Sequence, residues 1–199
     1  MGERERMKVA KTSIRDFNRW SETYEDSWLQ RILFDRVQDA VLGLAGMEAQ
    51  GTILDIGCGT GRLLRKGRAR WPRAELVGID PAEGMVRRAR ELMPDATFHL
   101  GMAESIPLPD ASVGLVVSTV SFHHWSDQLQ GLREVARVLR PGGRFILGDI
   151  VSPKFLHHGQ PRTRAEIRGM FGQAGLEVQL QERILWRTCL VTVGRRNPM

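Results

Sequence analysis

The stretch Ile53-Leu54-Asp55-Ile56-Gly57-Cys58-Gly59-Thr60-Gly61 decides the fold of this 199-residue chain. Ile53, Leu54 and Ile56 form a short apolar run, which is typical of a strand buried on both faces. Three glycines at alternate positions follow it directly. Because glycine has no side chain, such a turn lets a ligand approach backbone N–H groups and the start of the next helix. The stretch therefore predicts a strand, a turn that binds a nucleotide-like ligand, and a helix.

Similar apolar runs return along the chain, separated by segments of helical pattern. The expected strands are 76–79, 97–100, 113–117 and 145–147, and the expected helices are 62–70, 83–92 and 127–139. Such alternation predicts a parallel sheet with right-handed crossovers. Residues 163–174 predict a helix ended by Gly175, and residues 177–184 and 189–193 predict a final hairpin. The fold class is α/β: a doubly wound, mostly parallel seven-stranded sheet with an antiparallel C-terminal hairpin and helices on both faces.

The residues before the first strand predict helices. Large aromatic side chains recur three or four residues apart, which places them on one helix face: Phe17, Trp20, Tyr24 and Trp28. Residues 28–45 continue at helical spacing, and Gly43 and Gly46 are expected to loosen or end that helix. Because no repeat or long linker divides the chain, one domain is predicted. It comprises a helical cap segment at 1–46, a cofactor-binding core at 52–150, and a C-terminal helix and hairpin at 151–199.

Composition narrows the function classes. The first residues are charged, and no stretch approaches the roughly 20 apolar residues of a spanning helix, so a cytoplasmic protein without a membrane span is expected. Cys58 and Cys189 lack the spacing of a zinc site, so no metal is expected. The net charge of +6 would suit nucleic acid. The arginines are scattered among glutamates, however, as on solvated helix faces, which makes nucleic acid the less favoured partner.

The turn does not follow the dinucleotide pattern G-x-G-x-x-G. Its third glycine is replaced by Arg62 or by Leu64, depending on where the pattern starts. Instead, Asp55 stands two residues before the first glycine, and Asp80 lies 19 residues after Gly61, at the end of the next expected strand. A carboxylate in that position can accept hydrogen bonds from ribose hydroxyls.

Four blocks, in order, resemble the class I S-adenosylmethionine-dependent methyltransferases, in particular their ubiquinone-biosynthesis-like small-molecule group, type 11. The blocks are Ile53 to Arg62; Val77-Gly78-Ile79-Asp80-Pro81 with Met85 and Ala89-Arg90; Gly101 to Leu108; and Arg133 to Gly143. The resemblance covers roughly residues 17–194. It implies a Rossmann-like fold, S-adenosyl-L-methionine as cofactor, S-adenosyl-L-homocysteine as product, and in-line methyl transfer to a small molecule that relies mainly on positioning.

The resemblance also implies a contact for each matching position. Asp55 would face the methionine ammonium, and Asp80 would hold the ribose. The other expected contacts are the backbone of Gly57, Cys58 and Gly59; Pro81, Met85, Met102, Ala103 and Glu104 around the adenine; and Ser118, Thr119 and Tyr24 near the methionine end or over the cofactor. Met102 stands where relatives commonly have an aspartate, so a side-chain acceptor for the adenine amino group is either missing or replaced by Glu104.

The methyl acceptor determines whether a general base is needed, since only a hydroxyl or similarly weak acid requires one. His123 is the expected base, with a role in shaping the pocket as the alternative. His157 and His158 either line the acceptor site or are solvated. The stretch from Asp149 to Thr163 is short for a substrate lid, so the N-terminal segment or a second subunit of a homo-oligomer would cover the site. An RNA or protein methyltransferase and a non-catalytic cofactor-binding relative stay open as alternatives.

Overall fold

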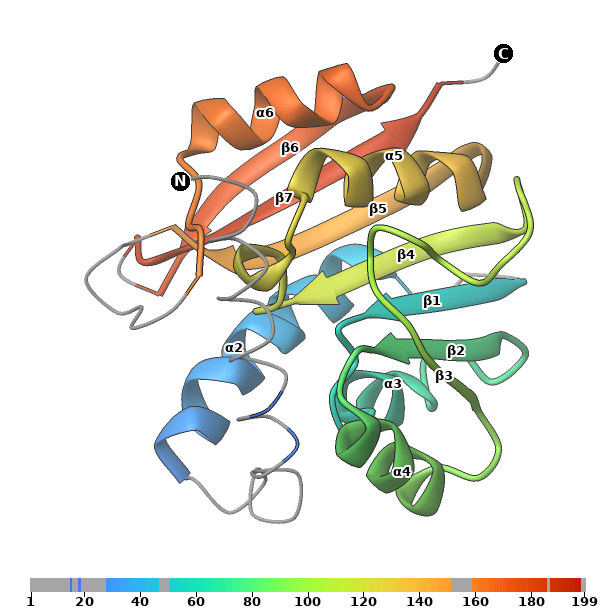
Figure 1. Ribbon diagram of the computed structural model, residues 1–199. Helices are drawn as coiled ribbons and strands as arrows, with labels where there is room; N and C mark the ends of the chain where they lie inside the picture. The colour runs from blue at the N-terminus through green and yellow to red at the C-terminus, as the bar shows by residue number, and fades with distance from the viewer. Residues whose placement is uncertain are drawn as a thin grey trace.

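The protein is described by a computed structural model, which covers residues 15, 18, 28–46, 51–151, 159–185 and 187–197. A seven-stranded sheet in the order β3-β2-β1-β4-β5-β7-β6 crosses the molecule (Figure 1). The strands are β1 (Thr52–Ile56), β2 (Glu75–Asp80), β3 (Thr97–Leu100), β4 (Val113–Thr119), β5 (Leu139–Ile150), β6 (Leu176–Ile184) and β7 (Cys189–Arg196). The pairs from β3 to β5 are parallel, whereas β7 is antiparallel to both β5 and β6. The expected fold class is confirmed.

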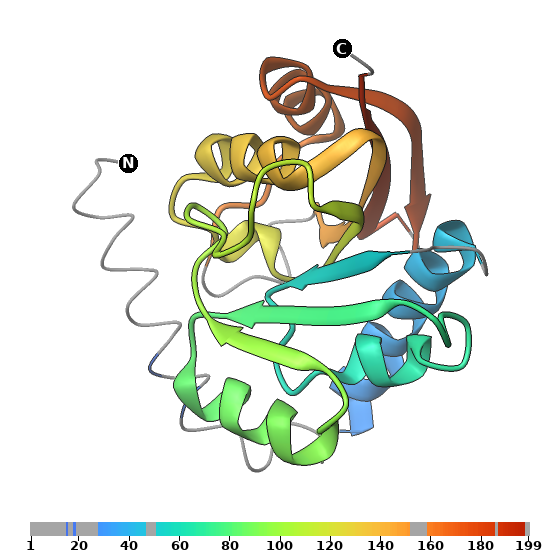
Figure 2. The same ribbon diagram turned by 90° about the vertical axis from the view of Figure 1, so that its right-hand side faces the viewer.

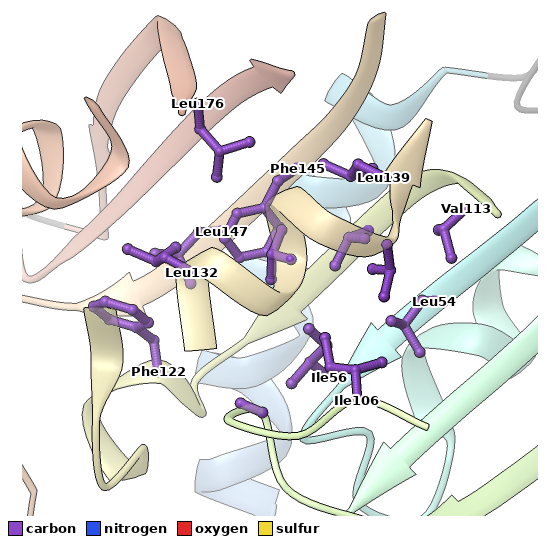
Figure 3. Close-up of a cluster of buried hydrophobic side chains, with 14 of the residues drawn as sticks. Leu54, Ile56, Ile106, Val113, Phe122, Leu132, Leu139, Phe145, Leu147 and Leu176 are labelled. Carbon is purple, nitrogen blue, oxygen red and sulfur yellow. The ribbon is translucent and has the colours of Figure 1, made fainter. Parts of the chain in front are cut away.

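Helices cover both faces of the sheet (Figure 2). They are α2 (Trp28–Ala45), α3 (Arg62–Gly67), α4 (Glu83–Leu92), α5 (Gln128–Val138) and α6 (Arg164–Gln173), with a 3-10 turn η1 (Phe122–His124) after β4. One core cluster joins α5 and α6 to the sheet, and Figure 3 shows its side chains converging between these elements. A second cluster joins α2, α3 and α4 to the opposite face.

Strand β1 contributes to both clusters. Leu54 and Ile56 pack in the cluster under α5 and α6, whereas Ile53 packs in the cluster under α2 and α3. Neighbouring side chains on a strand point to opposite faces, so a strand covered on both sides needs apolar residues on both. This is the physical reason for the apolar run that announces β1 in the sequence.

Several element ends differ from the sequence expectation. Helix α3 ends at Gly67 rather than near residue 70, because the Trp71 ring packs where a Cβ of Gly67 would stand. Strand β5 starts at Leu139, well before the apolar run at 145–147, because Leu139 pairs with Val113 of β4. Helix α2 continues through Gly43 and ends before Gly46, whose φ of 77° favours glycine.

The C-terminal helix α6 begins and ends as its sequence predicts. The Thr163 side chain accepts from the Glu166 N–H, and the Glu166 side chain accepts from the Thr163 N–H, which completes a capping box. Gly175 follows the helix with φ of 80°. The aromatic segment at residues 17–24 lies outside the described residues except for Asn18.

Candidate cofactor site

The glycine-rich turn follows β1, at the point where the strand order of the sheet reverses. Strand β1 pairs with β2 on one side and with β4 on the other. The helix that follows β1, α3, covers one face of the sheet, and the helix that follows β4, α5, covers the opposite face. A crevice at the carboxyl ends of such strands is the usual ligand position in open α/β sheets. Gly57, Gly59 and Gly61 all have positive φ, at 70°, 53° and 78°. A Cβ on Gly57 would also collide with the Ser121 side chain, so both conformation and space require glycine there.

Asp80 braces the turn from the end of β2. Its carboxylate accepts from the Gly59 N–H at 2.9 Å and from the Ala82 N–H at 2.9 Å. Burial raises the pKa of Asp80 to about 6, although these two N–H groups oppose the shift by stabilising the charge. Each carboxylate oxygen has a second lone pair, so Asp80 can still accept hydrogen bonds from a ligand.

A cavity of about 780 Å³, partly open to solvent, extends from the turn across the ends of β2 and β4. The predicted site residues in its lining are Gly57, Gly59, Asp80, Pro81, Met85, Met102, Ala103, Glu104 and Thr119. Glu104 also accepts from the Asp127 N–H at 2.9 Å, which links the loop that follows β3 to the start of α5.

A smaller cavity of about 460 Å³ lies beside the first and shares Gly57, Gly59, Thr119 and Val120 with it. Asp55 and Gln38 both line it. The Oδ1 atom of Asp55 is buried without a hydrogen-bond partner. Burial and, to a smaller extent, the nearby Asp80 together raise the pKa of Asp55 to about 8. A buried carboxyl group without a partner is costly unless a cation or donor reaches it.

The two cavities together fit the cofactor that the sequence implies. Asp80 lines the larger cavity, as expected of a residue that holds a ribose. Asp55, whose Oδ1 has no hydrogen-bond partner, lines the smaller one, where an ammonium group would satisfy it. The Gly59 position supports the same reading, because a Cβ there would meet no protein atom within 4 Å. Room for a ligand therefore exists on both sides of the turn.

The remaining predicted cofactor residues are Ser118, Cys58 and Tyr24. Ser118 is fully buried outside both cavities, and its hydroxyl donates to the Ile56 carbonyl at 2.9 Å. Cys58 lines only the smaller cavity, and burial raises its thiol pKa well above the ordinary value, which does not suit a nucleophile. Tyr24 lies outside the described residues. Nearby, however, the Asn18 side chain accepts from the Gly84 N–H at 2.8 Å, at the first turn of α4.

The histidine pair after β4 occupies two different environments. His123 is 2 % exposed; its Nδ1 lies 2.7 Å from Asp149 Oδ1, and its backbone N–H donates to Asp149 Oδ2 at 2.7 Å. The His124 ring lies 4.0 Å from the His123 ring, centroid to centroid, and lines the larger cavity. His123, the base expected from the sequence, therefore lies behind His124. His157 and His158 lie outside the described residues.

The sequence reasoning missed several lining residues. Ser121 and Trp125 line the larger cavity, and the Trp125 indole N–H donates to the Ser121 hydroxyl at 3.1 Å. Gln38 lines the smaller one from α2. The run from Val120 to Ser126 directly follows a strand that ends at the site, a signal that could have marked the first two. Nothing in the helical spacing of α2 marks Gln38.

Two further features of the described residues concern metal binding and membranes. No group of three or more His, Cys, Asp and Glu side chains in these ranges is arranged to hold a metal ion. No helix in the described part of the chain is long and apolar enough to cross a membrane.

Residues 54–147 match the family described as "Methyltransferase domain". The chain is 34% identical over 152 residues to 27-O-demethylrifamycin SV methyltransferase of Amycolatopsis mediterranei, a match that covers 71% of this chain and 55% of that protein. It is 41% identical over 109 residues to malonyl-[acyl-carrier protein] O-methyltransferase of Methylococcus capsulatus, covering 51% and 39%. The chain thus spans about half the length of these curated relatives.

Among solved structures, the fold superposes with a TM-score of 0.81 and 25% identity on a chain from a complex of the Haloferax volcanii Trm112 methyltransferase activator with a putative methyltransferase. The superposition covers 91% of this chain and 97% of that one. In its family match, its sequence relatives and its fold, the chain is therefore similar to the class I S-adenosylmethionine-dependent methyltransferases.

Proposed function

We propose that the protein transfers a methyl group from S-adenosylmethionine to a small-molecule acceptor. When bound, the cofactor supplies an electrophilic methyl group on a sulfonium sulfur. The work left to the protein is to hold donor and acceptor in line and to exclude water, and positioning alone can lower a barrier by roughly 7–11 kcal/mol. We also propose that the single domain comprises a cap segment at 1–46, a cofactor-binding core at 52–150 and a C-terminal part at 151–199, and that the protein is cytoplasmic.

One observation carries the proposal: two buried carboxyl groups face adjoining cavities across a glycine turn. Asp80 lines the cavity of about 780 Å³, whereas Asp55 lines the one of about 460 Å³. We assign the ribose to Asp80, the methionine ammonium to Asp55, and the adenine to the wall formed by Met85, Ala103 and Glu104. The Gly57 and Gly59 backbone would lie between the two ends of the ligand.

The acceptor would approach from the side of the histidine pair. His124 lines the cavity, so we propose that it receives the proton when the acceptor is a hydroxyl, while Asp149 fixes His123 behind it. The names of two relatives support an oxygen acceptor: one is an O-methyltransferase, and the other methylates a 27-O-demethyl compound. A direct base role for His123 stays a prediction, and variants at the two positions separate them.

A second candidate, methylation of a macromolecule with the help of an activator protein, is favoured by one observation. The structure with TM-score 0.81 was solved with such an activator. In this chain Leu100, at the end of the edge strand β3, is 56% exposed, and an exposed apolar side chain at a strand edge suits a protein contact. Replacing Leu100 by serine should leave activity on small molecules unchanged under the first proposal, and lower an activator-dependent activity under the second.

An acceptor screen tests the main proposal. Purified protein and S-adenosylmethionine would be incubated with pools of small hydroxyl, amine and thiol compounds, with RNA, and with protein extract, and release of S-adenosylhomocysteine would be measured. The proposal predicts release with a small-molecule pool and its loss in Asp80→Ala. Cofactor binding without release in any pool would indicate the non-catalytic alternative, and release only with RNA or protein would favour the macromolecular one.

A further inference from the structure

The smaller cavity has a polar wall that no sequence motif announced. Gln38, on α2, is 8% exposed and lines the cavity together with Asp55, from β1. Among the buried side-chain oxygens of the described residues, only Gln38 Oε1 and Asp55 Oδ1 have no hydrogen-bond partner. Both are acceptors, and both belong to the lining of the same cavity. A ligand with several N–H donors at one point would satisfy the two together.

The position of α2 that brings Gln38 to this wall is determined by packing. A Cβ on Gly148 of β5 would stand 2.7 Å from Val37 and 3.0 Å from Val41, so the absence of a side chain there lets α2 lie close to the sheet. Val37 and Val41 are both buried. Gln38 therefore stands on a helix held against the sheet by its neighbours, rather than on a surface that can adjust freely.

Ion pairs also hold α2 to the neighbouring helix α3. Asp35 lies 2.7 Å from the Arg62 guanidinium and 2.9 Å from the Lys66 ammonium, which ties α2 to the start of α3. Arg62 itself lines the smaller cavity. The lining therefore combines buried acceptors, Gln38 and Asp55, with one cation, Arg62. That combination complements a zwitterionic α-amino acid, whose ammonium needs acceptors and whose carboxylate suits a guanidinium.

We propose that Gln38 is a binding residue for the α-amino group of the methionine moiety, which it would hold together with Asp55, and this inference rests on the proposed function. An ammonium has three donors, so it can satisfy Gln38 Oε1 and Asp55 Oδ1 and keep one for another partner. Helix α2 then acts as a wall of the cofactor site and selects ligands that carry an amino-acid end over those that carry adenosine alone.

Two ligands distinguish this role from a purely structural one. S-adenosylhomocysteine carries the amino-acid end, whereas 5′-methylthioadenosine has the same adenosine and thioether without it. Calorimetric titration of both would be carried out on the wild type, on Gln38→Leu, which keeps the size but removes the acceptor, and on the control Arg36→Leu, an exposed position on the same helix. Thermal unfolding of each variant would be followed in parallel.

Gln38→Leu is expected to bind S-adenosylhomocysteine about ten- to a hundredfold more weakly and 5′-methylthioadenosine as the wild type does. Its melting temperature should not fall, because an unpartnered buried acceptor is removed. Arg36→Leu should bind both ligands normally. Unchanged affinity of Gln38→Leu for S-adenosylhomocysteine, or an equal loss for both ligands, would overturn the role of Gln38. No binding of S-adenosylhomocysteine by the wild type would instead overturn the proposed function.

Discussion

Asp55 is the residue on which the chemistry of the site depends most. Burial and the neighbouring Asp80 raise its pKa from 3.8 to about 8. The same group is expected to be ionised in the unfolded chain from about pH 4 upward. The folded protein therefore retains a proton that the unfolded chain has lost, and the ligand-free protein loses stability as the pH rises from about 4 to about 8.

Asp55→Asn tests this directly, because asparagine does not titrate. The variant should be more stable than the wild type in the absence of ligand, by about 1–3 kcal/mol at pH 8, because the amide, unlike the carboxyl group, needs no proton uptake on folding. The gain should be smaller at pH 5. Urea unfolding at the two pH values measures it, and a gain that does not depend on pH would contradict the assigned pKa.

Ligand binding should release the proton of Asp55. An ammonium beside the carboxylate lowers its pKa, so the affinity for S-adenosylhomocysteine should rise between pH 6 and pH 8, by at most about tenfold per pH unit. Calorimetry in buffers of different ionisation enthalpy would detect the proton, and Asp55→Asn should show none from this site. Equal binding enthalpies in all buffers at pH 7 would show that Asp55 does not meet the ammonium.

Substitutions of the two neighbouring histidines, His123 and His124, are expected to affect kcat differently. If the acceptor is a hydroxyl, His124→Gln should lower kcat by about a hundredfold or more and leave S-adenosylhomocysteine affinity near the wild-type value. Asp149→Asn should lower stability, since the Asp149 carboxylate accepts from His123 and Ile150 N–H groups in a buried position. A large loss of kcat in His123→Gln, with His124→Gln unaffected, would return the base role to His123.

At the scale of elements, the turn between β1 and α3 leaves no room for a side chain at its first glycine. Gly57→Ala should lower the free energy of unfolding by at least about 1 kcal/mol, because its φ of 70° disfavours alanine and its Cβ would collide with Ser121. Binding of S-adenosylhomocysteine should be lost with it.

The matched control is Gly43→Ala, inside α2, where a Cβ would meet no atom within 4 Å. It should raise stability by up to about 1 kcal/mol, because alanine favours a helix interior. Denaturant unfolding and calorimetry on the two variants check both expectations. Normal stability and binding in Gly57→Ala would show that the turn is not rigid.

Elements were predictable where packing acts on every residue. Strands such as β1 and β4 are buried on both faces, so their apolar runs identify them without knowledge of the fold. The ends were less predictable. The start of β5 at Leu139 depends on its partner in β4, and the end of α3 depends on Trp71 packing on Gly67.

At the scale of the whole molecule, the site combines segments that are far apart in the sequence. The lining residues Asp80 and Gly57 could be identified from sequence motifs, because binding of the ligand requires those residue types at that spacing. Gln38 and the ordering of His123 behind His124 depend on how α2 and η1 lie against the sheet. Spacing along one helix or turn cannot report that position.

The central claim is that the cavities on either side of the glycine turn hold S-adenosylmethionine. Titration calorimetry of the wild type and Asp80→Ala with S-adenosylhomocysteine tests it most directly. We predict one site per chain in the wild type, and binding weaker by about 1.5–3 kcal/mol in the variant, the value of a hydrogen bond to a charged group. No binding by the wild type at millimolar ligand would contradict the claim, and equal affinities would remove Asp80 from the ribose.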